Sequence, residues 1–266
     1  MYSFYMAEKK PGTLHIGTSG WMYKDWGELF YPSTLKKGHL SFLAQTFKTV
    51  EINSSFYHLP LKSTFEKWAD EVPDDFRFAV KISKFITHQK KLKSVRTPLE
   101  LFVKRAAPMQ EKLGVILVQL PPSLAFDMAL IENFVEDILV VTQRNYPIRF
   151  ALEVRHKSWI EEGQYPQVIE LLRKSGIALV FAQSGKMVSV PPEKKYVTSN
   201  FVYLRFHGPH AFAASRYGAR LLKPWALRVE EWLKEGLDVF VYFNNDIQGH
   251  AIYDAKTFTL QLKKFL

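Results

Sequence analysis

The sequence predicts an α/β protein, a single TIM-type (β/α)8 barrel with eight parallel strands. Three observations predict this fold. Short β-branched or aromatic runs recur along the 266 residues, and several are nearly continuously apolar, which is typical of parallel strands buried on both faces. Helical patterns fill most of the intervals between them. The turn after the first run, GTSGW, carries only Gly17 and Gly20, so it lacks the phosphate-binding fingerprint of the competing fold, a doubly wound open sheet.

The predicted strands are rich in Val, Ile, Leu, Phe and Tyr, and most are followed by residues that favour turns. This composition separates them from the more polar segments between them. In chain order they begin at Leu14 (LHIGTS), Thr49 (TVEINSSF), Phe76 (FRFAVKIS), Gly114 (GVILVQL), Arg149 (RFALEVR), Ala178 (ALVFAQ), Phe201 (FVYLRFHG) and Asp238 (DVFVYFNN).

Apolar residues at helical spacing predict helices between these strands. One helix ends at Ser175 before Gly176, a typical C-terminal stop, and another ends near Gly236. The segment from Met187 to Ser199 is predicted to be a loop with little helix. The apolar positions that define the helices are Leu40, Leu43, Ala44 and Phe47; Phe134, Ile138, Leu139 and Val141; Val168, Ile169, Leu171 and Leu172; Trp225, Val229, Trp232 and Leu233; and Ala255, Phe258, Leu262 and Phe265.

The chain is expected to form one domain, because it contains no Ser/Gly-rich linker and no low-complexity tract. We expect residues 1–13 to be an N-terminal extension and residues 14–266 to be the barrel. An apolar fraction of 47% is enough for a substantial core and argues against disorder.

Charge and cysteine content narrow the function classes. The formal net charge of +10 favours anionic partners, either a small molecule or a nucleic acid. The absence of cysteine excludes disulfides, a thiolate nucleophile and sulfur-ligated zinc. No apolar run approaches the length of a membrane span, and charge comes too early for a secretory signal, so we expect a cytoplasmic protein without membrane contact. The sequence does not indicate an oligomeric state.

Polar residues occupy late positions in six of the predicted strands. Alternate residues of a barrel strand point inward, and those near the C-terminal ends line the mouth where barrel proteins place their sites. Buried charges are costly unless they are paired, so their recurrence predicts a functional mouth. These residues are Glu51 and Asn53, Lys81, Gln119, Glu153 and Arg155, Arg205 and His207, and Asn244.

Two interpretations of the charged residues stay open. Glu51 and Glu153 could neutralise two of the three cations and leave a polar plug that binds nothing. Alternatively, Lys81, Arg155 and Arg205 exceed the two carboxylates by about one positive charge, which favours a phosphate or carboxylate ligand. We favour ligand binding, because barrel mouths are where ligands usually lie.

The loops after the last two strands give the anion hypothesis a second support. Barrels often hold phosphate with these loops, and backbone N–H groups at a helix start favour anions. Here the loops contain Gly208, in HGP, and Asn244 and Asn245, in NNDIQG. Ordinary turn and capping chemistry is the alternative interpretation of the two asparagines.

Aromatic residues follow several strands at the predicted rim. Trp21 and Tyr23 follow the first strand, Tyr57 the second and Trp159 the fifth. Aromatic faces of this kind can stack on sugars or bases. The alternative is that these side chains only cover the end of the barrel and bind no ligand.

For catalysis, Glu153 is the first candidate general acid or base and Glu51 the second, since a carboxylate in a charged mouth can have its pKa tuned. His207 is a third candidate, for proton transfer. No cofactor is predicted. A divalent metal at Glu51, Glu153 and His207 is disfavoured, because the chain lacks the dense His/Asp/Glu set of a multi-metal phosphoesterase.

A basic segment offers a different function. Between Phe76 and Leu99 the chain has no acidic residue, and its basic residues mostly follow the third strand, beside the expected mouth. Phosphate backbones select such patches, although a solvated lysine loop is an equally simple interpretation. The candidate nucleic-acid contacts are Lys84, Lys90, Lys91, Lys93 and Arg96.

Ordered motifs along nearly the whole chain resemble one family, the YecE-like proteins or domain of unknown function 72. The resemblance implies a barrel of the TIM type and no firmly assigned activity. The motifs are GTSGWMYKDW with FYP, TVEINSSFYHLP, RFAVKISKFITH, VQLPPS, ALEVRHKSW, YLRFHG, RYG and VYFNND.

Three function classes remain. The first is binding or turnover of an anionic small molecule at the mouth, which bears a phosphate or carboxylate group, with or without a sugar. The second is nucleic-acid binding or processing through the basic segment. The third is a non-catalytic ligand-binding barrel. We rank the first ahead, because the charges converge inside the mouth, where only a small group or a flipped base fits.

Overall fold

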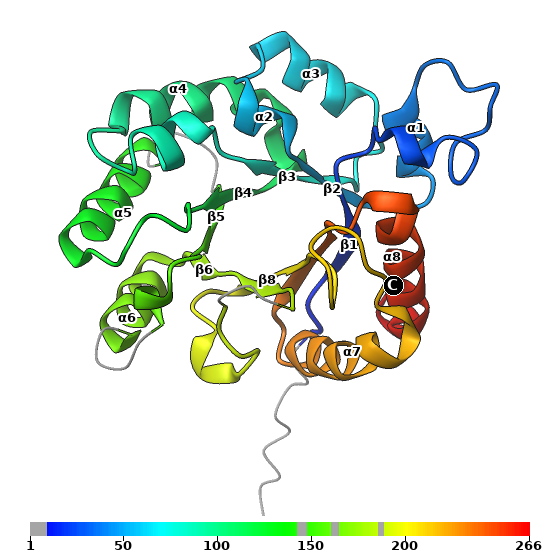
Figure 1. Ribbon diagram of the computed structural model, residues 1–266. Helices are drawn as coiled ribbons and strands as arrows, with labels where there is room; N and C mark the ends of the chain where they lie inside the picture. The colour runs from blue at the N-terminus through cyan, green and yellow to red at the C-terminus, as the bar shows by residue number, and fades with distance from the viewer. Residues whose placement is uncertain (1–9, 143–147, 161–164, 186–188) are drawn as a thin grey trace, which may run out of the picture.

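Within residues 10–142, 148–160, 165–185 and 189–266, which this computed structural model describes, nine parallel strands form one sheet. The sheet curls into a nearly closed barrel with helices around it (Figure 1). Its strand order is β6-β5-β4-β3-β2-β1-β9-β8-β7. Strands that follow one another in the chain are therefore neighbours except β6 and β7, which lie at the two ends of the sheet, and β9 pairs with β1. The strands are β1 (Leu14–Ser19), β2 (Thr49–Ile52), β3 (Arg77–Lys81), β4 (Leu113–Gln119), β5 (Arg149–Glu153), β6 (Ala178–Leu179), β7 (Phe181–Gln183), β8 (Phe201–Phe206) and β9 (Asp238–Phe243).

The predicted barrel class is confirmed, but the predicted number of eight strands is wrong. The run from Ala178 to Gln183 is divided into β6 and β7, which pair with different neighbours: β6 with β5, and β7 with β8. At the break, the Val180 N–H donates to the Leu152 carbonyl oxygen at 2.9 Å. The first half of this run pairs with β5 and the second half pairs with β8. The run therefore links the two end strands of the sheet.

Helices cover the outside of the barrel in the intervals where the sequence predicts them (Figure 1). The strand predicted from Thr49 ends early, because residues after Asn53 turn into a short helix. The α-helices are α1 (His39–Ala44), α2 (Ser54–Tyr57), α3 (Lys62–Asp70), α4 (Arg96–Ala106), α5 (Met128–Thr142), α6 (Tyr165–Ser175), α7 (Gly218–Lys234) and α8 (His250–Gln261). The shorter helical turns are η1 (Lys24–Trp26), η2 (Phe85–Gln89), η3 (Ala107–Lys112), η4 (Lys157–Trp159), η5 (Lys194–Tyr196), η6 (Ile247–Gly249) and η7 (Lys263–Phe265).

The predicted loop from Met187 to Ser199 contains only the three-residue turn η5 in its described part, which begins at Ser189. Met187 and Val188 lie outside the described residues, as do residues 1–9 of the predicted N-terminal extension. Gly12 is held against the barrel, because its N–H donates to the Leu233 carbonyl oxygen at 2.9 Å.

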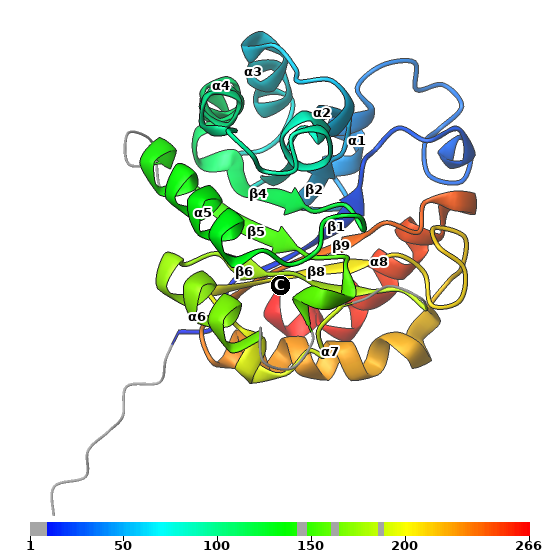
Figure 2. The same ribbon diagram turned by 60° about the vertical axis from the view of Figure 1, so that its left-hand side comes forward.

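All strands run in the same direction, so their C-terminal ends lie at one end of the barrel. Figure 2 shows the barrel from the side, with the loops that follow β1 and β8 at this same end. We call this end the mouth. No helix in the described part of the chain is both long enough and apolar enough to cross a membrane.

A compact layer of side chains fills the middle of the barrel, below the mouth. Small residues leave room for aromatic rings, and the Tyr242 hydroxyl lies 2.7 Å from Thr49 Oγ1. Gly17 is part of this layer because β1 approaches β2 closely: a Cβ atom at Gly17 would lie 2.0 Å from the Thr49 carbonyl oxygen. The buried cluster consists of Ala79, Val115, Leu117, Ala151, Ala178, Val180, Ala182, Phe201, Tyr203, Phe240 and Tyr242.

We predict that Gly17→Ala destabilises the barrel, because the added methyl group forces β1 and β2 apart. Overpacking of this kind costs about 1–3 kcal/mol. Urea unfolding should show it as a lower transition midpoint.

The matched control is Gly27→Ala. Gly27 is exposed, has an ordinary φ of −57°, and a Cβ atom there has its nearest neighbour at 3.8 Å. Equal midpoints for the two variants would contradict the close approach of β1 and β2.

Candidate functional site at the barrel mouth

Arg205, on β8, joins two carboxylates inside the barrel. Its Nε and Nη2 donate to the two oxygens of Glu51 at 2.9 and 2.7 Å. Its Nη1 donates to Glu153 Oε2 at 2.6 Å. Glu51 lies on β2 and Glu153 on β5, and neither strand is a neighbour of β8, so these contacts cross the barrel interior. All three side chains are essentially inaccessible to solvent.

The two carboxylates have further donors around them. Ser19 Oγ donates to Glu51 Oε1 and the Tyr203 hydroxyl to Glu51 Oε2, both at 2.7 Å. Arg155 Nε donates to Glu153 Oε1 at 2.6 Å. Each carboxylate oxygen therefore accepts at least one hydrogen bond from the protein itself.

These contacts set the charge state of Glu153. Burial alone acts to raise the pKa of its carboxyl group, but Arg155 and Arg205 outweigh it and hold the pKa well below its usual range. Burial likewise acts to lower the pKa of Arg205, and Glu51 and Glu153 together raise it above its ordinary value. Glu153 is thus held as a carboxylate, which opposes a role as general acid.

The cations at the mouth keep unused donors. Among the described residues, Arg155 donates only through Nε, so both of its terminal nitrogens lack a protein acceptor. Lys81 Nζ donates to Gln119 Oε1 at 2.7 Å and lies 4.1 Å from the centre of the Phe56 ring. Burial, with Arg205 adding to it, lowers the pKa of Lys81 to about 7.

His207, which follows β8, is fully buried and also has a free nitrogen. Its Nδ1 lies 3.0 Å from Asn244 Nδ2, which can only donate, so Nδ1 accepts and the hydrogen of the neutral ring lies on Nε2. Nε2 has no hydrogen-bond partner among the described residues. Burial lowers the pKa of His207 well below its usual value, and Arg205, Arg155 and Lys81 add to this.

The loops after β8 and β9 are mostly satisfied within the protein. Gly208 has a φ of +102°, and its N–H donates to the Tyr217 hydroxyl at 3.0 Å. Asn245 is buried, and its Nδ2 donates to the Ser215 carbonyl oxygen and to Asp254. Asp254 also accepts the N–H groups of Tyr217 and Gly218, where α7 begins. Of the three loop residues predicted from the sequence, Asn244 is the one that touches another site residue, His207.

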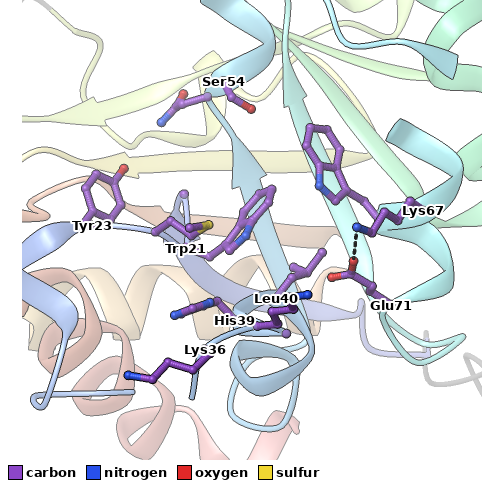
Figure 3. A pocket seen from close by; sticks show the side chains of 14 residues that line it. Trp21, Tyr23, Lys36, His39, Leu40, Ser54, Lys67 and Glu71 are labelled. Carbon is purple, nitrogen blue, oxygen red and sulfur yellow. Dashed lines mark ion pairs between the residues drawn. The ribbon is translucent and has the colours of Figure 1, made fainter. Parts of the chain in front are cut away.

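Beside the mouth, a cavity of about 660 Å³ opens between the loop after β1 and the helices α1, α2 and α3. Trp21 lies in its middle, with Lys36 and His39 on one side and the Lys67–Glu71 ion pair on the other (Figure 3). We call it the rim cavity. Its lining residues include Gly20, Trp21, Tyr23, Lys36, Lys37, His39, Asn53, Ser54, Lys67, Trp68 and Glu71.

Three of the residues predicted from the sequence thus share the rim cavity: Trp21, Tyr23 and Asn53. Trp21 packs edge to face against Trp68, with 5.5 Å between ring centres. Asn53 Oδ1 is buried without a hydrogen-bond partner among the described residues. The cavity therefore combines aromatic faces with an unused acceptor.

Two predicted aromatic residues lie elsewhere. Trp159 is buried in the core beneath the loops, where its Nε1 donates to the Leu124 carbonyl oxygen at 2.8 Å and its ring packs against Phe126. Tyr57 is 60% exposed and packs against Phe56. The structure therefore brings neither ring into the rim cavity.

Asp246 also lies close to the site residues, although nothing in the sequence indicated it. Its Oδ1 is buried and has no hydrogen-bond partner among the described residues. Burial raises the pKa of its carboxyl group to about 8, although the contact with Tyr23 acts in the opposite direction. Asp246 directly follows Asn245 in the NNDIQG loop. Asn, Asp and Gly are common turn residues, so nothing in the sequence distinguishes Asp246 from an ordinary turn residue.

The basic segment after β3 forms η2 and the turns that follow it. Lys90 and Lys93 are exposed, Lys84 and Lys91 are half-buried, and the buried Leu92 anchors the segment. Arg96 is already engaged, since its Nε lies 2.6 Å from Asp137 on α5. Four lysines of the predicted set are thus without an acidic partner among the described residues.

Within the described part of the chain, no group of three or more His, Asp or Glu side chains is arranged to hold a metal ion. The oxygens of Glu51 and Glu153 already face guanidinium groups, and the free His207 nitrogen carries a hydrogen. This donor set fits an anion better than a cation.

Comparison with known proteins agrees with the motifs. A family model described as a protein of unknown function, DUF72, matches residues 15–265. The UPF0759 protein YunF of Bacillus subtilis is 27% identical over 266 residues, which cover 91% of this chain and 92% of that protein. The UPF0759 protein YecE of Escherichia coli is 23% identical over 237 residues, or 82% of each chain. The family resemblance indicated by the motifs is confirmed.

Solved structures share the fold. A crystal structure of a DUF72 family protein from Thermotoga maritima superposes with a TM-score of 0.77 at 29% identity, covering 95% of this chain and 98% of that one. A DUF72 family protein from Enterococcus faecalis gives a TM-score of 0.78 at 22% identity, with 96% and 99% of the two chains covered.

We predict that Glu153→Gln destabilises the protein at pH 7 by about 3 kcal/mol, because Arg155 loses its carboxylate partner and the buried Arg205 loses one of its two. The pKa of Glu153 is depressed in the folded state, so its stabilising contribution is fully present above the unfolded-state value of about 4.3 and is lost as the pH falls below it. Urea unfolding between pH 3 and pH 7 measures both effects.

The control is Glu170→Gln, on the exposed surface of α6, where ion pairs with Arg173 and Lys174 contribute little. The variant Glu153→Gln should also show a flatter loss of stability below pH 5 than the unaltered protein. Identical pH profiles would show that Glu153 is not held as a carboxylate by Arg155 and Arg205.

Proposed function

The chain belongs to the DUF72 protein family, and we propose that it binds a small anionic ligand, bearing a phosphate or carboxylate group, at the mouth of its barrel. The proposal rests on an excess of donors. The carboxylate oxygens of Glu51 and Glu153 already accept hydrogen bonds from the protein. Among the described residues, several N–H donors around them, some of them positively charged, have no acceptor. A ligand that completes this arrangement must supply acceptor oxygens.

The buried Nε2 of His207 carries the proposal. An N–H group that is buried without an acceptor costs about 1–3 kcal/mol, so a native structure rarely keeps one without a use. Lys81 and Arg155 are close enough to His207 to lower its pKa. The oxygens of a phosphate or carboxylate would satisfy these three groups together, and charge-assisted hydrogen bonds of this kind are the strong ones.

The rim cavity suggests what else the ligand carries. Trp21 and Trp68 present aromatic surface, on which a sugar ring can pack. Asn53 lines this cavity, and its unpartnered Oδ1 can accept a hydrogen bond from a hydroxyl group. We therefore propose a sugar-containing or otherwise hydroxylated ligand whose anionic end reaches the mouth.

Acid/base catalysis by the two glutamates fits the structure less well than binding does. Both are ion-paired, and Glu153 is held ionised. Groups whose pKa lies near neutrality are better suited to proton transfer, and at the mouth these are Lys81 and Asp246. Any turnover is therefore proposed to involve these two rather than Glu51 and Glu153.

We predict that Arg155→Met weakens the binding of glucose 6-phosphate roughly tenfold or more, because a charge-assisted hydrogen bond is worth about 1.5–3 kcal/mol. Glu153 keeps its bond to Arg205 in this variant, so the fold should survive. Isothermal titration calorimetry with glucose 6-phosphate, inorganic phosphate and glucose separates the anionic from the sugar contribution.

Arg220→Met is the matched control, since Arg220 is exposed on α7. It should leave the affinity unchanged. If neither phosphate compound binds, or if both variants lose affinity equally, the proposal of an anion site at the mouth is wrong.

A second candidate function, nucleic-acid binding, is favoured by one observation. Exposed aromatic rings lie beside the lysines of the basic segment: Lys84 Nζ lies 5.6 Å from the centre of the Tyr57 ring, and Lys90 Nζ lies 5.7 Å from that of Phe85, which is 42% exposed. Aromatic surfaces flanked by cations are typical of single-strand binding. The ion pairs of Arg96 remove it from the proposed contact set.

If this candidate is correct, changing Lys90, Lys91 and Lys93 to Gln should flatten the log–log salt dependence of single-stranded DNA binding by roughly two to three units, since each phosphate contact contributes about 0.7–0.9. Changing Lys263 and Lys264, near the C-terminus, should leave the slope unchanged. Equal effects of the two sets, or no measurable binding at about 50 mM salt, would exclude it.

A further inference from the structure

A second cavity lies at the end of the barrel opposite the mouth. It has a volume of about 530 Å³, a size typical of ligand sites, and is lined by residues near the N-terminal ends of β1, β3, β4, β5 and β9. We call it the base cavity. The layer of buried side chains that fills the middle of the barrel separates it from the mouth, and Phe240 of that layer forms part of its wall.

One ion pair in the base cavity is complete within the protein. Arg149 Nη2 lies 2.7 Å from Asp238 Oδ2, and the other oxygen of Asp238 accepts the Thr13 N–H at 2.8 Å. Because β5 and β9 are not neighbours, this pair joins two separate strands across the base of the barrel. The N-terminal end of a barrel usually serves stability, and the pair fits that role without a ligand.

Arg77, at the start of β3, is held in place but not paired. Its Nη1 donates to the carbonyl oxygens of Asp74 and Phe76 at 2.8 and 3.0 Å, which fixes the guanidinium group. Among the described residues, its Nε and Nη2 have no acceptor and the group forms no ion pair. An Nε–Nη2 edge that is fixed in this way can bind a carboxylate through two parallel hydrogen bonds.

His15 is the second unsatisfied group that lines the cavity. It is only 9% exposed, and its Nδ1 is buried without a hydrogen-bond partner among the described residues. Burial lowers the pKa of the ring to about 4, with Arg77 and Arg149 adding to it against Asp238, so the ring is neutral at pH 7. A neutral imidazole carries its hydrogen on either nitrogen, so Nδ1 can donate to a ligand oxygen.

The wall around these groups favours an aromatic ligand. The His15 ring stacks on Phe240, with 4.5 Å between ring centres and 17° between the planes. Gly114 keeps the space between Phe240 and Arg77 free of a side chain, since a Cβ atom there would lie 3.2 Å from Phe240 Cε1 and 3.3 Å from Arg77 Cβ. A carboxylate alone would fill a small part of this cavity, whereas a flat ring beside these faces would fill much more of it.

We propose that the base cavity is a second ligand site, which binds a planar aromatic carboxylate. The carboxylate pairs with the free edge of Arg77 and accepts a hydrogen bond from His15 Nδ1, while the ring packs against Phe240. Asp75 and Glu111 also line the cavity and disfavour a multiply charged group such as a phosphate ester. The site shares no residue with the mouth or the rim cavity, so this inference is independent of the proposed function.

The test uses the full-length protein and para-fluorobenzoate, whose binding is followed by fluorine NMR. We expect saturable binding with a dissociation constant in the millimolar range or below. The backbone amide signals of His15 and Gly114 should shift with the same constant, which places the probe in the base cavity. Inorganic phosphate and fluorobenzene each supply only one half of the ligand, so they should bind roughly tenfold or more weakly.

Two variants test the proposed contacts. Arg77→Lys keeps the positive charge but loses the two parallel N–H groups, and it should lower the affinity roughly tenfold or more. His15→Phe keeps the stacking on Phe240 but removes Nδ1, and it should lower the affinity severalfold. Arg220→Met, on the exposed surface of α7, is the matched control and should leave the affinity unchanged. The urea midpoint of each variant shows that it is folded.

The inference is overturned if para-fluorobenzoate shows no saturable binding at millimolar concentration, or if Arg77→Lys and His15→Phe bind it as well as the unaltered protein does. A loss of binding in Arg155→Met but not in Arg77→Lys would assign the probe to the mouth. That result would overturn the base cavity as an aromatic carboxylate site and would support the proposed anion site instead.

Discussion

The structure of the mouth depends on one guanidinium group. Arg205 reaches from β8 across the barrel to Glu51 on β2 and Glu153 on β5. Charges inside a barrel are tolerated only when they are paired and hydrogen-bonded, and a planar guanidinium can serve two carboxylates at once. This bridge holds three distant strands in a defined arrangement above the layer of small and aromatic residues.

The same bridge determines which polar groups at the mouth remain available to a ligand. Arg205, Arg155, Ser19 and Tyr203 use the carboxylate oxygens. Among the described residues, the terminal nitrogens of Arg155 and the Nε2 of His207 then have no acceptor, and Lys81 Nζ donates only to Gln119. A carboxylate pair alone would suggest acid/base or metal chemistry. Once the pair is neutralised, the mouth becomes a set of donors with a partly uncharged lysine among them, next to a cavity with aromatic walls.

The division of the strand after Ala178 and the role of Asp246 were not predictable from the sequence. Periodicity marks residues 178–183 as one buried run, and nothing in it shows that the two halves follow different neighbours, because pairing is a long-range choice. Asp246 looks like a turn residue, and its raised pKa comes from burial by segments distant in sequence. Trp159 is the opposite case. Its place after the fifth strand predicted a residue at the rim, but its ring is buried in the core against Phe126.

The sequence by itself determined the barrel class, the approximate positions of the strands and the inward parity of Glu51, Glu153 and Arg205, because apolar runs and the two-residue period of a strand are local properties. The family also followed from the ordered motifs. Only the tertiary structure decided which charges meet. Arg205 could have paired with either glutamate or with a ligand, and Lys81 with a carboxylate or with Gln119. Those choices depend on distances across the barrel, which are set by the packing of all the strands together.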